Sequence, residues 1–307
     1  MSPRPLPLAG AALPALALMF NAFAWGVSWW PFRELQALGL HPLWATVIIY
    51  GLAVVGISLW RPRSWLELAR APALWVVLLA SGATNATFNW AVTIGDVVRV
   101  VLLFYLMPLW AVLLARALLG EPLTMRAGVR VLIALTGAAI VLWPAGAGGL
   151  AWPEGAGPGA SLPMPRSLAE WLGVVGGFCF ALNNVMLRRE ADRPEAARAL
   201  AMFAGGCAVS AVVALALGAQ GSVPWPPPAA AGWIAGTALL ALFFVASNLA
   251  LQYGASRLPA HVTAVVMVTE VLFASVSAVL LGAANLSLPL LIGGLLIVGA
   301  ALLAARD

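Results

Sequence analysis

Long apolar stretches alternate along this chain with short polar or Pro/Gly-rich gaps. A helix that rises about 1.5 Å per residue needs about 20 apolar residues to cross a hydrocarbon core about 30 Å thick. Ten stretches reach this length, at roughly 8–30, 42–60, 72–94, 97–119, 124–143, 168–188, 196–218, 229–252, 259–281 and 287–304. The pattern predicts an all-α polytopic membrane protein with ten transmembrane helices.

Composition supports this class and excludes others. Of the 307 residues, 63% are hydrophobic and 9% are charged, and no soluble domain of this length needs ten such segments. The net charge of +5 does not indicate nucleic-acid binding, because the basic residues flank the apolar stretches, where they face anionic lipid headgroups.

The distribution of arginine predicts the topology. All 16 basic residues are arginines, and cytoplasmic loops of membrane proteins are enriched in basic residues. With the N-terminus cytoplasmic, 13 arginines fall inside and three, Arg33, Arg99 and Arg166, fall outside. An odd number of spans would place Arg306 outside. We therefore expect ten spans in the cytoplasmic membrane of a bacterium, with both termini in the cytoplasm.

The first apolar segment begins like a signal peptide, with Arg4 ahead of it, but it is too long for a signal-peptide core and no cleavage site is followed by a polar sequence. We expect it to remain as the first helix. Cys179 and Cys207 both fall inside predicted spans, where we interpret them as small buried hydrophobes rather than as a disulfide or a metal pair.

The longest gap, residues 144–167, is rich in Gly, Ala and Pro and divides the predicted helices five and five. Such a composition buries too little apolar surface to fold alone, so we expect an external linker between two repeats, residues 1–143 and 168–307.

The two halves show weak self-similarity. The matched segments are Asn89–Gly95 with Asn248–Gly254, Leu118–Gly120 with Leu280–Gly282, and Gly137–Ala139 with Gly299–Ala301. The first pair is 159 residues apart and the other two are 162 apart, so an insertion of three residues after Gly254 reconciles them. Since each half has an odd number of spans, the halves cross the membrane in opposite senses. Inverted repeats are typical of secondary transporters, whose substrate site lies near the midplane between the halves.

On these features the chain resembles the drug/metabolite transporter (DMT) superfamily, EamA type. The motifs that carry the resemblance are the helix ending at Leu118-Leu119-Gly120-Glu121-Pro122-Leu123, Pro108 thirteen residues before Glu121, and the glycines of the following helix, Gly128 and Gly137. Within the superfamily it is most similar to the YddG-like exporters of aromatic and neutral amino acids. The resemblance implies a basket of ten helices around a central cavity lined by the third, fourth, eighth and ninth, with the first and sixth adding walls. It also implies export by alternating access.

The second half departs from the family pattern. At the position equivalent to Pro108 stands Glu270, and at the position equivalent to Glu121 stands Ala283. Glu270 is the one ionisable residue near the middle of a predicted span, where a charge is costly unless it faces a cavity. It lies on one helix face with Thr263, Met267, Ala274 and Ser277, which form a narrow polar stripe. Two interpretations remain open: recognition of a substrate ammonium or a proton, and a buried structural acid.

Carboxamides form the rest of the candidate site. Asn can join membrane helices by hydrogen bonds, or bind both charged groups of a zwitterion without fixed charges. The amides fall on the helices that the repeat places around the cavity. The predicted substrate-binding residues are Asn21, Trp25, Asn85, Asn89, Tyr105, Asn183, Asn248, Gln252, Met267 and Glu270.

Pro108 interrupts the fourth predicted helix and is the candidate gating residue, with a static kink as the alternative. Of the tryptophans, most lie near span ends, as an interfacial belt predicts, whereas Trp25, Trp90 and Trp110 lie deeper. Small-residue spacings such as Gly173/Gly177 favour packing within a monomer over dimerisation.

No enzyme class fits the sequence. His41 and His261 lie near predicted helix ends on opposite sides of the membrane, and the acids other than Glu270 lie in loops or at span ends. No Walker A motif and no metal or cofactor pattern is present. We expect a secondary transporter of small amphipathic metabolites, foremost neutral or aromatic amino acids. The alternatives are an uncoupled channel or facilitator and an exporter of another small metabolite or drug.

Overall fold

The computed structural model describes residues 8–120, 125–142, 164–190, 192–255, 257, 266–267, 269–283 and 287–304. Its helices, in chain order, are α1 (Leu8–Val27), α2 (Trp29–Ala37), α3 (Pro42–Trp60), α4 (Ser64–Arg70), α5 (Pro72–Ile94), α6 (Val97–Phe104), α7 (Met107–Leu119), α8 (Met125–Leu142), α9 (Leu168–Arg189), α10 (Glu195–Ala219), α11 (Ala231–Ala255), α13 (Thr269–Leu280) and α14 (Leu288–Ala304). Each of the ten apolar stretches contains helix, so the all-helical class is confirmed.

Length and composition qualify six segments of the described chain as membrane spans: Ala12–Ala37, Pro42–Trp60, Val97–Leu119, Leu168–Arg189, Glu195–Ala219 and Ala231–Leu251. A seventh arises if α4 and α5, which meet at an angle of 104°, count as one. Shorter apolar helices lie at Val131–Val141, Thr269–Leu280 and Leu288–Ala300. A polytopic membrane protein is therefore the class that the helices support, while ten spans and the inverted repeat stay predictions.

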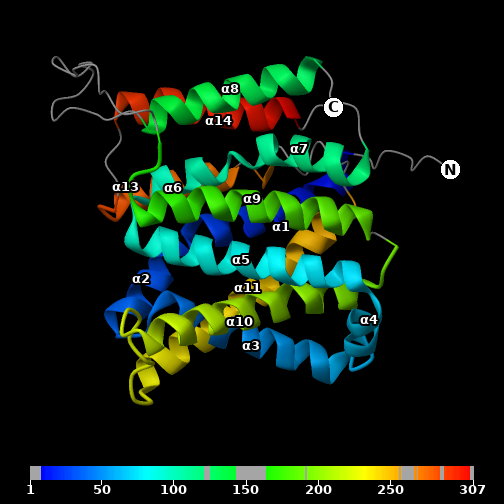
Figure 1. The fold of residues 1–307 in the computed structure, drawn as a ribbon, viewed down its shortest axis with the longest axis vertical. Coiled ribbons are helices and arrows are strands. Elements are labelled where there is room, and N and C mark those ends of the chain that lie inside the picture. The colour runs from blue at the N-terminus through cyan, green and yellow to red at the C-terminus, as the bar shows by residue number, and fades with distance from the viewer. Residues whose placement is uncertain are drawn as a thin grey trace.

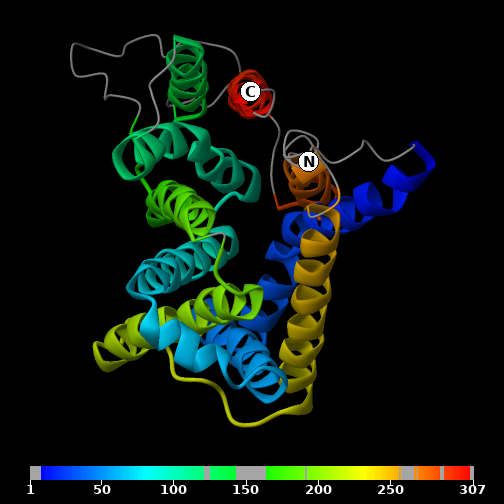
Figure 2. The same ribbon diagram turned by 90° about the vertical axis from the view of Figure 1, so that its right-hand side faces the viewer.

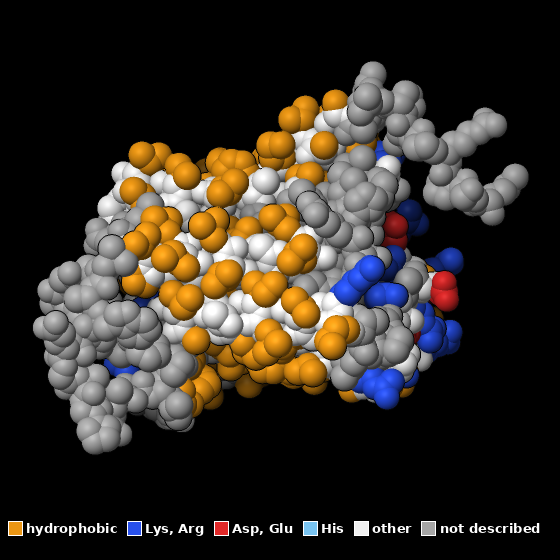
Figure 3. Space-filling view, turned by 90° about the horizontal axis from the view of Figure 1, so that it is seen from above, with side chains coloured by type: hydrophobic (Ala, Val, Ile, Leu, Met, Phe, Trp, Pro, Cys, Tyr) orange, Lys and Arg blue, Asp and Glu red, His pale blue; other side chains and the backbone are white. Residues whose placement is uncertain are grey.

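The flanks of the molecule are apolar. Large hydrophobic side chains point outward with most of their surface exposed, among them Leu59 at 81%, Leu242 at 69% and Leu295 at 73%. Figure 3 shows hydrophobic side chains across the flank and arginines gathered at one end. Because an exposed apolar surface of this extent is unfavourable in water, it is the surface that contacts lipid.

Most of the helices run side by side, roughly parallel to one another (Figure 1). Seen from the side, α5, α7 and α9 form one wall, α1, α11 and α13 form the opposite wall, and α3 and α10 join the two (Figure 2). Packing contacts connect α3 to α10, α10 to α5, α5 to α9, and α9 to α6 and α7. On the other wall α1 packs on α11 and α13, α11 returns to α3, and α13 returns to α6.

Local sequence explains where several helices begin. Asp96 and Ser167 are N-caps whose side-chain oxygens accept hydrogen bonds from the backbone N–H groups of Arg99 (2.8 Å) and Glu170 (3.2 Å). Proline occupies the first turn of α3 and of α5, where its missing N–H costs no helical bond.

Two glycines that the repeat pairs end their helices in the same way. Gly120 follows α7 with φ of 72°, and Gly282 lies just beyond α13 with φ of 67°. Both values are left-handed, a conformation that glycine adopts without a steric penalty. Gly39 and Gly221 also have positive φ, so this conformation is common at the helix ends of this protein and the repeat stays a prediction.

Helices α5 and α10 approach so closely that glycine is required at the crossing. A Cβ added to Gly205 would lie 2.0 Å from the carbonyl oxygen of Leu78, and one added to Gly82 would lie 2.4 Å from that of Gly205. Small residues at such crossings let helix backbones pack directly against each other in membranes.

We expect Gly205→Ala to lower the free energy of unfolding by about 1–3 kcal/mol, because the added methyl group forces two backbones apart. Gly299→Ala is the matched control, since a Cβ there has no neighbour within 4 Å. Thermal unfolding of the two purified variants in the same detergent checks the difference. Equal midpoints would contradict the crossing.

Candidate substrate-binding site

A small buried pocket lies where the two walls face each other. Its volume is about 120 Å³. It is lined by Asn21, Trp25, Tyr50, Ser81, Thr84, Asn85, Phe88, Phe104, Phe180, Asn183, Met202, Phe203, Asn248, Leu251, Met267 and Glu270. Seven of the ten residues predicted from the sequence thus meet at one place: Asn21, Trp25, Asn85, Asn183, Asn248, Met267 and Glu270.

Glu270 is held across the interior by Tyr105. The Tyr105 hydroxyl lies 3.0 Å from Glu270 Oε2 and 3.3 Å from the Met267 carbonyl oxygen. Both side chains are buried, with Glu270 9% and Tyr105 3% exposed. This hydrogen bond connects α13 with the end of α6, so two predicted residues from opposite halves of the chain are in direct contact.

The contact falls at the interruption of the fourth predicted span. α6 ends at Phe104, Tyr105 is its C-cap, and α7 begins at Met107 with proline in its first turn. A proline there lacks an N–H for the preceding turn, which separates two helical pieces of one span. The predicted interruption is confirmed. The side chain of Pro108 lies outside the described residues, and its gating role stays a prediction.

Asn21 joins α1 to α11. Its Nδ2 donates to the Ser247 carbonyl oxygen at 2.9 Å and to Ser247 Oγ at 2.7 Å. Because a carbonyl oxygen can only accept, these bonds fix which end of the amide is nitrogen. The other end, Asn21 Oδ1, is buried and has no hydrogen-bond partner among the described residues.

Asn85 is fully engaged within its own wall. Its Nδ2 donates to the Ser81 carbonyl oxygen at 2.8 Å, and its Oδ1 accepts from the hydroxyl of Tyr50 on α3. Asn183 is 1% exposed, and its Nδ2 lies 3.5 Å from Asn184 Oδ1. Its Oδ1 has no hydrogen-bond partner within the described part of the chain. Asn184 itself is exposed and is not among the residues that line the pocket.

Three predicted residues do not line the pocket. Tyr105 acts through Glu270, as described above. Asn89 is 0% exposed and its Nδ2 donates to Thr46 Oγ1 at 3.0 Å, so it joins α5 to α3 one turn away from Asn85. Gln252 falls in α11, but its side chain lies outside the described residues.

The polar stripe around Glu270 divides between two roles. Met267 lines the pocket, whereas Ser277 Oγ accepts from Trp29 Nε1 at 3.0 Å and Ala274 is packed against Gly26 of α1. Thr263 is outside the described residues. Of the deeper tryptophans, only Trp25 lines the pocket; Trp90 packs on His41 and Trp110 on Phe178.

Sequence reasoning missed the aromatic contribution of α3 and α10. Tyr50 and Phe203 both line the pocket, and their rings pack together at 5.6 Å between centroids. The family resemblance implies that other helices line the cavity, so it does not predict a role for these two residues in the pocket. The one available signal is that Tyr50 is a polar aromatic residue in the middle of an apolar stretch.

A larger cavity of about 1190 Å³ adjoins the pocket between α3, α10 and α11. We call it the vestibule. Its lining includes Arg61, Arg63 and Glu195 at one end of the molecule, and it shares Phe203 and Asn248 with the pocket. These two side chains therefore border both cavities.

At the opposite end of the molecule, polar contacts join the helices to each other. Arg33 of α2 donates from Nη2 to the Gly95 carbonyl oxygen at 2.6 Å and from Nε to that of Val92 at 3.3 Å, which joins the α1–α2 wall to the end of α5. Its guanidinium lies 5.0 Å from the Trp29 ring centroid.

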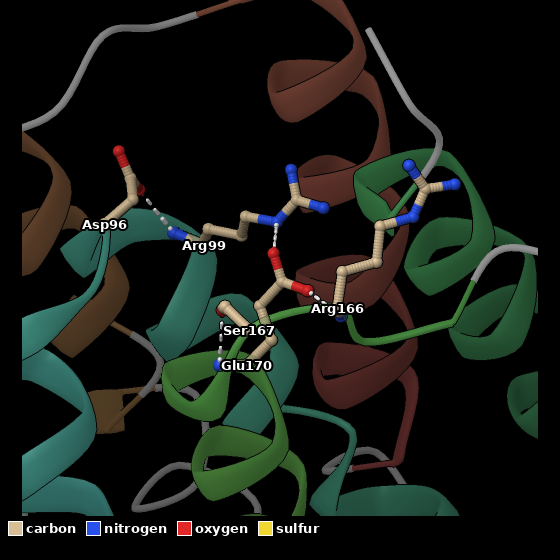
Figure 4. A network of polar contacts seen from close by, with 5 residues as sticks. All are labelled: Asp96, Arg99, Arg166, Ser167 and Glu170. Carbon is tan, nitrogen blue, oxygen red and sulfur yellow. Dashed lines mark hydrogen bonds and ion pairs between the residues drawn. The ribbon is translucent and has the colours of Figure 1, made fainter.

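A second network at this end joins α6 to α9 (Figure 4). Arg99 Nε lies 2.7 Å from Glu170 Oε1, and Glu170 Oε2 accepts from the backbone N–H of Arg166 at 2.7 Å. Asp96 and Ser167, the two N-caps, complete it. The network connects the first half of the chain to the second at the end where the pocket is closed.

Asn248 and Asn89 differ in position: Asn248 lines both the pocket and the vestibule, whereas Asn89 lines neither and joins α5 to α3. We expect Asn248→Leu to reduce transport at least tenfold with little change in the thermal unfolding midpoint. We expect Asn89→Leu to lower the midpoint, because it leaves the Thr46 hydroxyl without its amide partner. Transport rate per folded molecule measures the first effect. Parallel losses of stability and transport in both variants would assign both amides to helix packing.

Comparison with known proteins supports the transporter class. Residues 12–143 match the model of the EamA-like transporter family. This match confirms the EamA-type resemblance over the first predicted repeat. Proteins of the EamA family are small-solute transporters of the DMT superfamily, and the match falls within the first predicted repeat.

Solved structures share the fold. Fifteen chains match, and one crystal structure of a protein aligns with a TM-score of 0.57 over 95% of this chain and 96% of its own, at 22% identity. No curated protein matches the chain. Across the described residues, no group of three or more His, Cys, Asp or Glu could hold a metal ion.

Proposed function

We propose that the protein is a secondary transporter that exports small amphipathic metabolites by alternating access, with neutral and aromatic amino acids as the expected substrates. One observation carries the proposal: a buried pocket with a carboxyl group, carboxamides and aromatic walls adjoins a large vestibule at one end, and polar contacts join the helices at the other end. A pocket that opens to one side at a time is what alternating access requires.

A channel would need a continuous polar path. Here the carbonyl-bound Arg33 and the Arg99–Glu170 ion pair lie at the closed end, and Tyr105 crosses the interior to reach Glu270. Arg33 and the Tyr105–Glu270 hydrogen bond join the two walls, so opening to that end requires these two contacts to break and the walls to move relative to each other. Such a motion is the step that distinguishes a carrier.

Counterflow in liposomes tests the proposal. The purified protein is reconstituted, the liposomes are loaded with unlabelled phenylalanine, and uptake of labelled phenylalanine and leucine is followed. A carrier gives uptake that is accelerated by substrate on the far side. Fast downhill flux without this acceleration would indicate a channel, and no flux of any small amphipathic solute would reject the proposal.

We also propose that the vestibule faces the cytoplasm and that the linker at 144–167 is external, since 13 of the 16 arginines fall on the inner side in this orientation. In a variant without Cys179 and Cys207, a cysteine introduced at Gly157 should react with an impermeant maleimide in intact cells. A cysteine at Arg193, which is exposed beside Glu190, should react only after lysis. The reverse pattern would overturn both the orientation and the inverted repeat.

A further inference from the structure

Hydrogen-bond donors of the pocket are largely engaged by the protein. The hydroxyls of Tyr50, Ser81 and Thr84 donate to Asn85 Oδ1, the Met202 carbonyl and the Ala80 carbonyl. The amide nitrogens of Asn21 and Asn85 donate to Ser247 and Ser81. A ligand that needs donors therefore finds few in this pocket.

Acceptors are open instead. Asn21 Oδ1 and Asn183 Oδ1 are buried without a hydrogen-bond partner among the described residues, and both side chains line the pocket. Glu270 adds a carboxyl group whose Oε2 already accepts from Tyr105. A buried acceptor without a donor is unfavourable, so a ligand that brings several N–H donors gains from meeting these oxygens.

The charges point to the same ligand. Glu270 is the one carboxylic acid among the described lining residues, and none of them is an arginine. The remaining donors of the described lining are neutral: the side-chain N–H groups of Trp25, Asn183 and Asn248. A substrate carboxylate would lose its hydration beside another carboxyl group without gaining a cation, whereas an ammonium would be paired with Glu270.

Aromatic rings supply the remaining surface. Phe104 packs on Phe88 and Phe180 with ring centroids 4.7 and 5.3 Å away, and Trp25 packs on Phe244 at 4.7 Å. Ring faces attract cations as well as apolar groups. The volume of about 120 Å³ is close to the roughly 150 Å³ of a protein cavity that holds benzene, so one ring or a short branched chain fits.

Resting on the proposed transport function, we propose that this pocket recognises a primary ammonium group on a compact apolar body and prefers amines without a free carboxylate over zwitterionic amino acids. Aryl- and alkylamines and amino-acid esters and amides are the substrate class. The carboxylate of an amino acid is tolerated at a cost rather than recognised.

Five probes with a common phenyl group test the preference on the unmodified protein: phenethylamine, phenylalanine methyl ester, phenylalanine, 3-phenylpropionate and 2-phenylethanol. Equilibrium binding is measured by calorimetry in lipid nanodiscs. We expect the amine and the ester to bind at least tenfold more tightly than phenylalanine, which corresponds to about 1.4 kcal/mol. The acid and the alcohol should bind more weakly than phenylalanine.

The outcomes separate the two proposals. If phenylalanine equals or exceeds the amine, or if 3-phenylpropionate binds as well as either, the preference for amines is overturned while transport of amino acids survives. Equal binding of the alcohol and the amine overturns ammonium recognition in the same way. If no probe binds and counterflow is absent for every small solute, the proposed function itself fails.

Discussion

Glu270→Gln is expected to weaken the binding of phenethylamine by about 10- to 100-fold. The substitution keeps the size and the hydrogen-bonding capacity of the side chain but removes the negative charge that faces the pocket. Hydrogen bonds to charged groups contribute about 1.5–3 kcal/mol, and each factor of ten in affinity corresponds to about 1.4 kcal/mol. Calorimetric titration of the reconstituted variant measures the loss.

The same variant distinguishes ammonium recognition from proton coupling. If Glu270 carries a proton instead, exchange between two substrate pools should persist in the glutamine variant while the response to a pH gradient is lost. Unchanged affinity, flux and pH dependence would leave Glu270 as a buried structural acid. The site would then consist of the amides alone.

Matched controls show that the effect belongs to this carboxyl group. Glu34→Gln removes an exposed carboxylate from α2 and should leave binding unchanged. Tyr105→Phe removes the hydroxyl that donates to Glu270 while keeping the ring, so it should produce the smaller loss, below about tenfold. His41 lies ahead of α3, and burial lowers its pKa to about 4, so it stays neutral between pH 5 and 8, the range of the pH-gradient test.

The helices were predictable because the hydrophobicity of many residues together indicates each one. Each apolar stretch contains many residues that favour burial or lipid, and the sum is insensitive to any single one. Helix ends were less predictable where tertiary structure decides them. The bend of 104° between α4 and α5 and the separation of α2 from α1 at Ser28 are not visible in hydropathy.

The candidate site was predictable where polarity alone decides burial. Glu270, Asn21 and Asn183 stand out because a polar group in an apolar helix needs a partner or a cavity, and each of them lines the pocket. Asn89 shows the limit of this reasoning. It lies one helical turn from Asn85 on the same face of α5. At that turn α5 packs against α3, and the Asn89 amide donates to Thr46. Periodicity gives the face of a helix, and only the neighbouring helix determines whether that face meets a cavity.

Aromatic lining was harder to predict for a related reason. Phe203 and Tyr50 lie in stretches where an aromatic residue is equally at home in lipid or in the core. Their place beside the pocket follows from the packing of α3 on α10, which brings the two rings together. Sequence alone contains no information on that crossing beyond Gly206, a small residue that lies against the Tyr50 ring.

The second large effect is expected at the closed end, where Arg33→Gln should shift the protein toward a conformation open to the outside. The guanidinium donates to two carbonyl oxygens at the end of α5 and thereby joins the two walls. Each such charge-assisted bond contributes about 1.5–3 kcal/mol, so losing one of them changes the ratio of the two conformations by about 10- to 100-fold.

Alkylation of a pocket cysteine from each side of the membrane measures this shift. Met202 lines the pocket, and Met202→Cys in a protein lacking Cys179 and Cys207 places a thiol there. With Arg33→Gln added, alkylation by an impermeant reagent supplied outside should accelerate at least tenfold. Arg70→Gln, an exposed arginine at the end of α4, is the control and should leave the rate unchanged. An unchanged external rate in the Arg33 variant, with normal transport, would show that these carbonyl contacts do not hold the closed end. The Arg99–Glu170 network would then be the next candidate for the closure, because it joins the two halves of the chain at the same end.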